Sequence, residues 1–170
     1  MAASRRMPRD EEFRRGFETR EICYTGTVNL ILDRLENHGR GERIDVSNYA
    51  IEHIMPEREL LTPEWRKELG KNWRHVHERC YHTIGNLTLA AYGSELGSSG
   101  FRRKQEMDGG FRNSPLRLNR GLADLDRWDE KAIKNRASEL SKLACEIWPC
   151  PSPPDVLDGY RGKEQNGSGR

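Results

Sequence analysis

Two neighbouring residues, Glu52 and His53 in the stretch AIEHIMPE, have side chains of the types that acid–base chemistry requires. A neutral imidazole, whose ordinary pKa is near ~6.5, can take a proton from water at cellular pH. Asn86, in the later stretch HTIGNLTL, can hold the second imidazole nitrogen if it lies on a neighbouring strand. A strand ending in histidine, a loop, a strand beginning at asparagine and a helix is the order of a ββα-metal site. We therefore predict phosphodiester hydrolysis with His53 as the general base, oriented by Asn86.

Glu52 is the first candidate for binding the metal ion of such a site. Hydrolysis of a phosphodiester needs a hard divalent cation, Mg²⁺ or Mn²⁺, to neutralise the departing oxygen, and carboxylate oxygens suit that cation. On a strand Glu52 points away from His53, so we expect a bend at the strand end to bring both to the phosphate. His82, which precedes the second strand, is a third catalytic candidate that could touch the scissile phosphate.

Basic residues follow the second strand and are candidates for binding DNA phosphate. They are Arg102, Arg103, Lys104, Arg117 and Arg120. Phosphate contacts do not depend on base sequence and are sensitive to salt. The formal net charge of the chain is only +2, which excludes a uniformly basic surface but allows a local basic face. The alternative is an ordinary solvated face, and proximity to the predicted site favours phosphate binding.

The stretch HVHERCYH offers a different metal site. Its zinc donors would be His75, His77, Cys80 and His82. Histidines two residues apart lie on different faces of a helix, so these donors do not converge on regular backbone. Zinc is therefore less favoured than Mg²⁺ or Mn²⁺. The four cysteines form no C-x-x-C pair, which is typical of reduced thiols in a cytoplasmic protein.

Length and composition indicate one domain with a modest core, because the chain has 170 residues and 33% of them are charged. No apolar run is long enough for a transmembrane helix, and the N-terminal stretch MAASRRMPRDEEF lacks the apolar segment of a secretory signal. We expect a flexible N-terminus over residues 1–8 and a folded domain over residues 9–150. Residues 151–170 are rich in Pro, Gly and polar types, which predicts a disordered tail.

Hydrophobic periodicity predicts an α+β fold that is mostly helical. The predicted helices cover residues 10–23, 25–39, 61–70, 99–107 and 127–148. The first two are expected to pack together as a hairpin, and Asp126 is expected to cap the last. Strands are predicted over residues 42–54 and 83–90, and a loop over residues 108–121. The two strands are expected to form a small ββα-metal hairpin core that the helices surround.

Several motifs occur in a fixed order between Phe13 and Pro151. They are IEHIMP, HTIGNLTL, F-x-x-K, SPLRLNR, W-x-x-x-x-I-x-x-R-x-x-x-L and IWPCP. As a set they resemble the HNH (His-Me finger) nuclease domain at the C-terminus of GmrSD-like, modification-dependent (type IV) restriction enzymes. The resemblance implies metal-dependent cleavage of DNA, with His53 as the general base, Asn86 orienting it and Glu52 near the metal. It also implies phosphate contacts from the basic residues named above.

The chain departs from the family pattern after the NLTL strand. The stretch AAYGSELGSSGF has Gly93 and Ser98 where amide side chains are expected. A glycine cannot ligate a metal through a side chain, so we expect Ser94 or Glu95 to serve as the metal ligand. The alternative is a catalytically degenerate module that binds DNA or docks to a partner without cutting.

In the resembled family a separate N-terminal nucleotide-binding domain senses modified DNA and controls the cut. The resemblance therefore implies double-stranded, modified or foreign DNA as substrate, and a sensor domain with NTPase function in cis or as a partner subunit. We expect a cytoplasmic protein of a restriction or antiviral defence system, without a membrane partner. The remaining alternative is an HNH nuclease that acts on RNA, or on invading DNA through another sensor.

Overall fold

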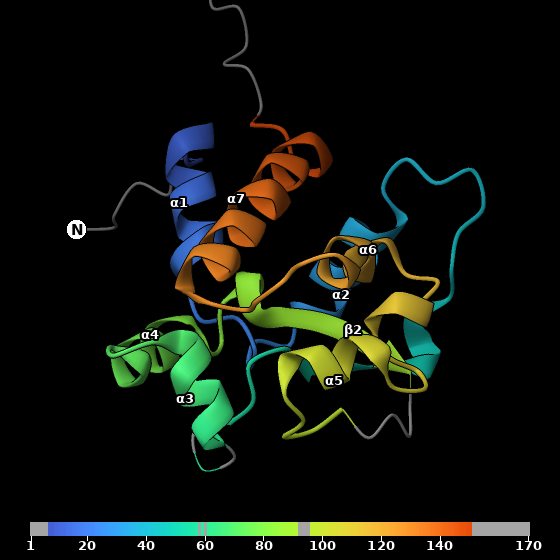
Figure 1. Cartoon of the computed structure of the whole chain (residues 1–170). Helices are drawn as coiled ribbons and strands as arrows, with labels where there is room; N and C mark the ends of the chain where they lie inside the picture. The colour runs from blue at the N-terminus through green and yellow to red at the C-terminus, as the bar shows by residue number, and fades with distance from the viewer. Residues whose placement is uncertain (1–6, 58, 60, 92–95, 151–170) are drawn as a thin grey trace, which may run out of the picture.

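The fold is built around a two-stranded antiparallel sheet, as the computed structural model in Figure 1 shows. Strand β1 is Tyr49–His53 and strand β2 is Leu87–Ala91, and His53 lies opposite Leu87 in the register. The structure describes residues 7–57, 59, 61–91 and 96–150. The predicted tail and all but two residues of the predicted flexible N-terminus lie outside these ranges. Both predicted strands are confirmed, although the first is shorter than its β-prone sequence.

Helices surround this sheet and confirm the predicted α+β class. The helices are α1 (Asp10–Thr19), α2 (Val28–Asn37), α3 (Pro63–Leu69), α4 (Trp73–Cys80), α5 (Phe101–Glu106), α6 (Arg117–Ala123) and α7 (Glu130–Ile147). Short 3-10 turns connect them: η1 (Val46–Asn48), η3 (Ile84–Asn86) and η4 (Phe111–Asn113). Of the helices in the described ranges, none has the length and apolar character needed to cross a lipid bilayer.

Helix α1 packs along α7, beside which it lies in Figure 1. Its Phe13 and Phe17 side chains join the same apolar cluster as Ala137 and Ala144 of α7. The predicted hairpin of the first two helices is therefore wrong, because α1 and α2 each pack on α7 rather than chiefly on one another. Helix α7 is the longest of the described helices, and its apolar stripe is long enough to receive both.

Helix α6 covers residues for which the sequence predicts a loop. The buried carboxylate of Glu36 accepts hydrogen bonds from the backbone N–H groups of Arg117 at 3.0 Å and Leu118 at 2.9 Å. A carboxylate at a helix N-terminus satisfies free N–H groups and interacts favourably with the helix dipole. Because Glu36 belongs to α2, this cap exists only in the folded chain and leaves no local sequence signal.

Helix α7 begins later than predicted. Its N-cap is Asp129, whose Oδ1 accepts a hydrogen bond from the Ala132 N–H at 2.9 Å, and the predicted cap Asp126 is wrong. Trp128, directly before the helix, is fully buried. Burial of this large side chain holds the segment before the Asp129 cap against the core.

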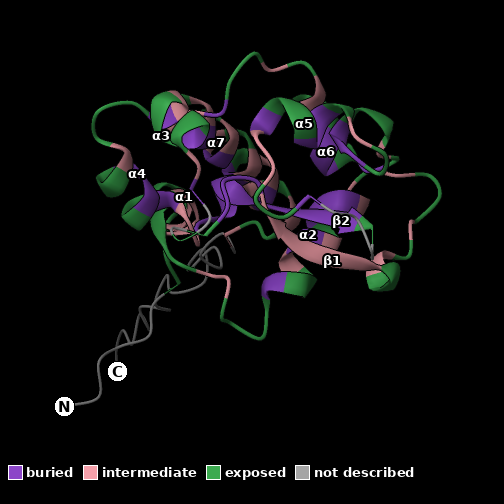
Figure 2. Ribbon diagram, turned by 60° about the horizontal axis from the view of Figure 1, so that its bottom comes forward, coloured by how far each residue is buried: buried purple, intermediate pink, exposed green. Residues whose placement is uncertain are grey.

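The sheet has a buried strand and a partly buried strand (Figure 2). Alternate residues of β2 enter different apolar clusters, because strand side chains alternate between faces. Leu87 and Leu89 join the cluster with α1, α2 and α7, and Ala90 joins the cluster that contains Trp65 and Trp128. The hairpin is therefore held from both sides, and β1 lies at its more accessible edge.

Candidate active site

His53 is the last residue of β1 and is partly buried. Its Nε2 atom lies 3.3 Å from Nδ1 of His82, and its ring stacks on Tyr81 with the ring centroids 4.2 Å apart. Burial, and after it the neighbouring His82 and Lys104, lowers the pKa of His53 to about 4. The imidazole is therefore neutral at physiological pH, the state in which it can accept a proton or bind a metal.

Asn86 is fully buried at the end of η3, directly before β2. Its Oδ1 accepts hydrogen bonds from the Met55 N–H at 2.8 Å and from Trp128 Nε1 at 3.0 Å. Its Nδ2 donates to the carbonyl oxygens of Met55 and Tyr81, both at 3.0 Å. These bonds use the whole capacity of the amide, so the expected bond to the His53 ring is not formed. The side-chain amide of Asn86 instead holds the backbone of Met55 and Tyr81, and its backbone carbonyl oxygen accepts a hydrogen bond from the Ile54 N–H, next to His53, at 3.0 Å.

Helix α7 holds the turn that carries Asn86. The guanidinium of Arg136 donates hydrogen bonds to three carbonyl oxygens of this turn at 2.8–3.0 Å. At Gly85 a Cβ atom would lie 2.5 Å from the Ile133 carbonyl oxygen, so only glycine permits this approach of turn and helix. Arg136 therefore stabilises this turn by hydrogen bonds to its backbone carbonyl groups.

Glu52 points to the opposite face of the hairpin from His53, because strand residues alternate. Its Oε1 lies 2.7 Å from Nζ of Lys104, which is fully buried and also donates to the His53 carbonyl oxygen at 2.9 Å. Burial raises the pKa of Glu52 and lowers that of Lys104, and their attraction opposes both shifts. Lys104 was predicted to bind phosphate, and this is wrong because its ammonium group is enclosed and bonded within the domain. The predicted bend that would bring Glu52 beside His53 is also not formed.

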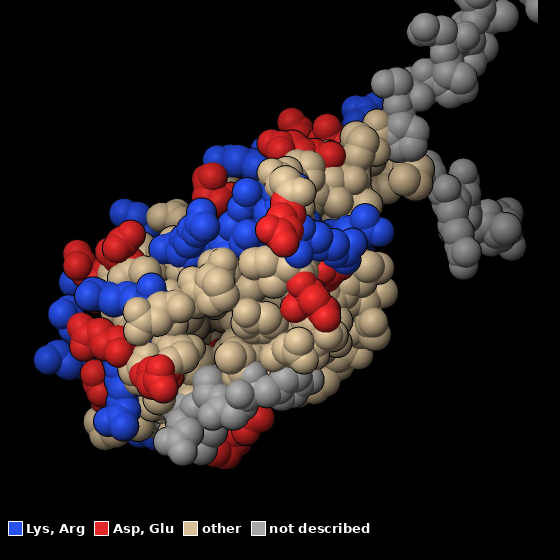
Figure 3. All heavy atoms as spheres, turned by 90° about the vertical axis from the view of Figure 1, so that its right-hand side faces the viewer, with Lys and Arg blue, Asp and Glu red and all other residues tan. Residues whose placement is uncertain are grey.

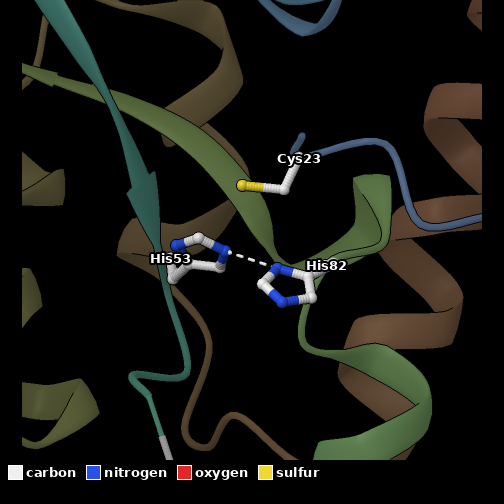
Figure 4. A group of neighbouring side chains, drawn as sticks. All are labelled: Cys23, His53 and His82. Atoms are coloured by element: carbon white, nitrogen blue, oxygen red, sulfur yellow. Dashed lines mark hydrogen bonds between the residues drawn. The ribbon is translucent and has the colours of Figure 1, made fainter. Parts of the chain in front are cut away.

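Cys23 joins His53 and His82 in a cluster of metal-binding side chains (Figure 4). One donor atom of each residue lies within 4.8 Å of the other two. Cys23 follows α1, and its segment is fixed by a hydrogen bond from the Ile22 N–H to the His82 carbonyl oxygen at 3.0 Å. Burial raises the pKa of the Cys23 thiol, so without a metal it stays protonated. No sequence motif connects Cys23 with either histidine, so its place in this cluster was not predicted.

The zinc set suggested by HVHERCYH does not assemble. His75 lies on the exposed side of α4, and His77 is buried with Nε2 3.0 Å from the Pro56 carbonyl oxygen. Of those four predicted donors, only His82 lies in the described cluster. The helical geometry that weakened this alternative at the sequence level is confirmed by α4.

Comparison with known protein families decides the assignment. Residues 7–143 match the family described as GmrSD restriction endonucleases, C-terminal domain. The chain belongs to this family. No curated protein matches the chain. This GmrSD C-terminal domain is thus a nuclease module of the restriction-endonuclease type, and the resemblance seen in its motifs is confirmed.

A GmrSD nuclease domain implies a divalent metal ion, and the described residues offer potential metal donors beside His53. They are imidazole nitrogens and the Cys23 sulfur, which do not fit Mg²⁺ because that cation prefers oxygen ligands. They suit a transition metal. The predicted oxygen ligands Ser94 and Glu95, together with Gly93, lie outside the described residues.

The other predicted phosphate contacts of this GmrSD domain lie on two helices. Arg102 and Arg103 are exposed on α5, and Arg102 forms an ion pair with Glu106 at 3.1 Å. Arg117 and Arg120 are exposed on α6. Figure 3 shows basic side chains in a band across one face of the molecule, with acidic side chains among them. That face is mixed in charge, so it offers local rather than broad attraction for phosphate.

A cavity of about 430 Å³ lies between α2, α6 and α7, away from His53. Apolar side chains such as Leu35, Leu122 and Leu140 form much of its lining. Acid–base chemistry needs polar groups that can exchange protons, and the cluster around His53 supplies them. We therefore place the candidate active site at His53 and not at this cavity.

Proposed function

We propose that this GmrSD C-terminal domain cleaves DNA phosphodiester bonds, by nicking or double-strand cutting, with His53 as the general base. The observation that carries the proposal is a neutral, partly buried imidazole at the end of β1 in a chain of a restriction endonuclease family. A neutral ring can remove the proton of an attacking water. A phosphate bound beside the ring brings negative charge, which favours the imidazolium that then forms.

His82 is proposed as a positioning residue for His53. When His53 Nε2 donates its proton to His82 Nδ1, the ring of His53 is fixed and its own Nδ1 carries the free lone pair. The stacked ring of Tyr81 restricts the same imidazole from one side. Water is therefore deprotonated at Nδ1 of His53 in this proposal, and His82 contributes through orientation.

Dependence on a cation is a prediction that the family implies. A divalent cation, when bound, would neutralise the charge that develops on the leaving 3′ oxygen. Mg²⁺ or Mn²⁺ stays the predicted ion, and Ser94 and Glu95 stay its predicted ligands. Glu52 is a weaker candidate than its sequence position indicates, because Lys104 already neutralises its charge.

The proposed substrate is double-stranded DNA that is modified or foreign. An N-terminal sensor with NTPase function, in cis or as a partner subunit, would control the cut, and the system would act in the cytoplasm. These proposals rest on the family of the chain. Arg102, Arg103, Arg117 and Arg120 remain the proposed phosphate contacts, because all four are exposed.

A plasmid-nicking assay tests the proposal. Supercoiled plasmid is incubated with the protein and Mg²⁺ or Mn²⁺, with and without EDTA. His53→Ala is expected to lower the rate by about 10²–10⁴-fold, the usual contribution of a general base. His75→Ala removes an exposed histidine of α4 and is the matched control, which should cleave like the parent. Equal rates for His53→Ala and the parent would overturn the proposal.

A second candidate function is DNA binding or docking without cleavage. Two observations favour it: Glu52 is neutralised by Lys104, and Gly93 occupies the place of an expected amide. Mobility-shift binding without nicking in either metal would support it. Gly93→Asn sharpens the test, because a large gain in cleavage identifies a lost metal ligand, whereas an unchanged rate assigns that role to another residue.

A further inference from the structure

Cys23, His53 and His82 come from three separate segments and converge near the end of the hairpin (Figure 4). Cys23 precedes α2, His53 ends β1, and His82 follows α4. All three are partly buried, so protein encloses their donor atoms without sealing them from solvent. We propose that they form a binding site for a transition-metal cation of the Zn²⁺ class, and that a metal bound there blocks cleavage.

The spacing of the two imidazoles fits a shared metal ion. His53 Nε2 and His82 Nδ1 lie 3.3 Å apart. Two nitrogens bound to tetrahedral Zn²⁺ at about 2.0–2.1 Å are themselves about 3.3 Å apart. Donor atoms of the trio lie within 4.8 Å of one another. A nitrogen and a sulfur on one Zn²⁺ are about 3.6 Å apart, so Cys23 needs a shift of only about 1 Å.

The segment that carries Cys23 is tied to the segment of His82 by backbone contacts. The Ile22 N–H donates to the His82 carbonyl oxygen at 3.0 Å, and Glu21 forms an isolated antiparallel bridge with Thr83. These contacts hold the thiol near the imidazoles before any metal binds. A site whose ligands are already in place loses less conformational entropy on binding.

Donor chemistry separates this site from the cation of the proposed cleavage reaction. Imidazole and thiolate bind Zn²⁺ and similar transition metals well, whereas Mg²⁺ prefers oxygen. Three protein ligands also leave the fourth tetrahedral position to water. The trio therefore selects a different class of cation from the Mg²⁺ or Mn²⁺ predicted for the nuclease.

Metal binding at this site would remove the free lone pair of His53, a consequence that rests on the proposed function. The metal takes the place of the proton between His53 Nε2 and His82 Nδ1. That proton is restored at Nδ1 of His53, and the thiol proton of Cys23 passes to solvent. In a metal-bound neutral imidazole the second nitrogen carries the proton. No nitrogen of His53 can then accept a proton from water, so the bound metal inhibits the cut.

Spectroscopy with Co²⁺ as the probe tests the site without reference to activity. The parent is expected to bind one Co²⁺ with a thiolate-to-cobalt absorption band, and Zn²⁺ should displace it. Cys23→Ser should abolish the band, and His82→Ala should weaken Zn²⁺ binding, measured against a chromophoric chelator, by about 10-fold or more. Cys145→Ser, which changes a cysteine on α7, is the matched control and should bind like the parent. A parent without the band, or unchanged Zn²⁺ affinity in Cys23→Ser, would overturn the site.

Cleavage assays test the inhibitory role separately. With Mg²⁺ or Mn²⁺ present, Zn²⁺ near one equivalent per chain should stop cleavage by the parent and by Cys145→Ser. Cys23→Ser should tolerate the same Zn²⁺, so that its cleavage rate with Zn²⁺ equals its own rate without Zn²⁺. Equal inhibition of Cys23→Ser and the parent, or stimulation of the parent by Zn²⁺, refutes the inhibitory role. If no protein cleaves DNA, the proposed function fails, and the Co²⁺ spectra still decide whether the metal site exists.

Discussion

Glu52 and His53 are adjacent on β1, yet the two faces of the hairpin place them in different chemistry. On one face the ring of His53 lies against Tyr81 and His82, groups that restrain it and share its proton. On the other face Glu52 forms an ion pair with the buried Lys104. Strand alternation thus places one residue of the motif in the proposed active site and the other in a buried ion pair. Neighbouring residues with catalytic side-chain types therefore need not serve the same reaction.

Exchanging the two neighbours for neutral residues should have the largest and most contrasting effect. His53→Gln is expected to lose cleavage by about 10²–10⁴-fold while the protein keeps its melting temperature. Glu52→Gln is expected to lower the melting temperature and to keep cleavage within about 10-fold when measured below the transition. Plasmid nicking and thermal unfolding measure the two effects. If Glu52→Gln abolishes cleavage in a protein of normal stability, Glu52 takes part in the reaction and the contrast between the faces disappears.

Asn86→Ala should produce the largest loss of stability on the His53 side. The substitution leaves the bonded groups of Met55, Tyr81 and Trp128 without partners in a buried place. Because each such group costs about 1–3 kcal/mol, we expect a loss of about 4 kcal/mol in the free energy of unfolding, read from urea titration. Asn86→Asp keeps the acceptor and loses the donors, so its free energy of unfolding should lie between those of the parent and Asn86→Ala. If the urea midpoint of Asn86→Ala equals that of the parent, the stability of the turn does not depend on this amide.

Lys104→Met should destabilise the opposite face by about 3 kcal/mol, since it leaves a carboxylate without its buried partner. The double variant with Glu52→Gln is expected to recover most of the loss, because both charges are then removed. A double-mutant cycle by chemical denaturation measures the coupling. If the two losses of stability simply add, Lys104 and Glu52 are not energetically coupled.

Arg103→Ala should have the smallest effect and contrasts with its neighbour on α5. Arg103 is exposed whereas Lys104 is buried, so only the former can reach DNA phosphate. We expect the slope of log affinity against log salt to fall by about 1 for Arg103→Ala. A folded Lys104→Met protein should keep the parental slope. A reduced slope in Lys104→Met alone would return Lys104 to the DNA-binding surface.

Helices with local signals were predictable from the sequence. Thr62 and Gly70 are such signals at the ends of α3: the Thr62 hydroxyl accepts a hydrogen bond from the Trp65 N–H at 3.3 Å, and Gly70 has φ +84°. Helix α6 could not be predicted in this way, because its cap is Glu36 of another helix. A capping residue that is distant in the sequence reaches the helix only after the chain has folded.

The candidate site also contains residues that local sequence predicts and partners that only the folded chain brings to them. His53, and the strand that ends at it, follow from local periodicity and a recognisable motif. The partners of its ring do not, since His82 and Cys23 reach it only after the hairpin and the N-terminal segment have assembled. Asn86 was predicted from the sequence to orient His53, but its actual partners, the Met55 backbone and Trp128, lie on a loop and on an indole that packing places.

By itself, the sequence determined the fold class, the strand that carries His53 and the nuclease family, because periodicity, capping residues and motif order are local properties of the chain. Only the tertiary structure decided that Lys104 neutralises Glu52, that Asn86 binds backbone, and that Cys23 faces the two histidines. Burial is the physical reason. Buried polar groups lose their contacts with water and must form hydrogen bonds to groups that the fold places near them. Those partners are often distant in the sequence.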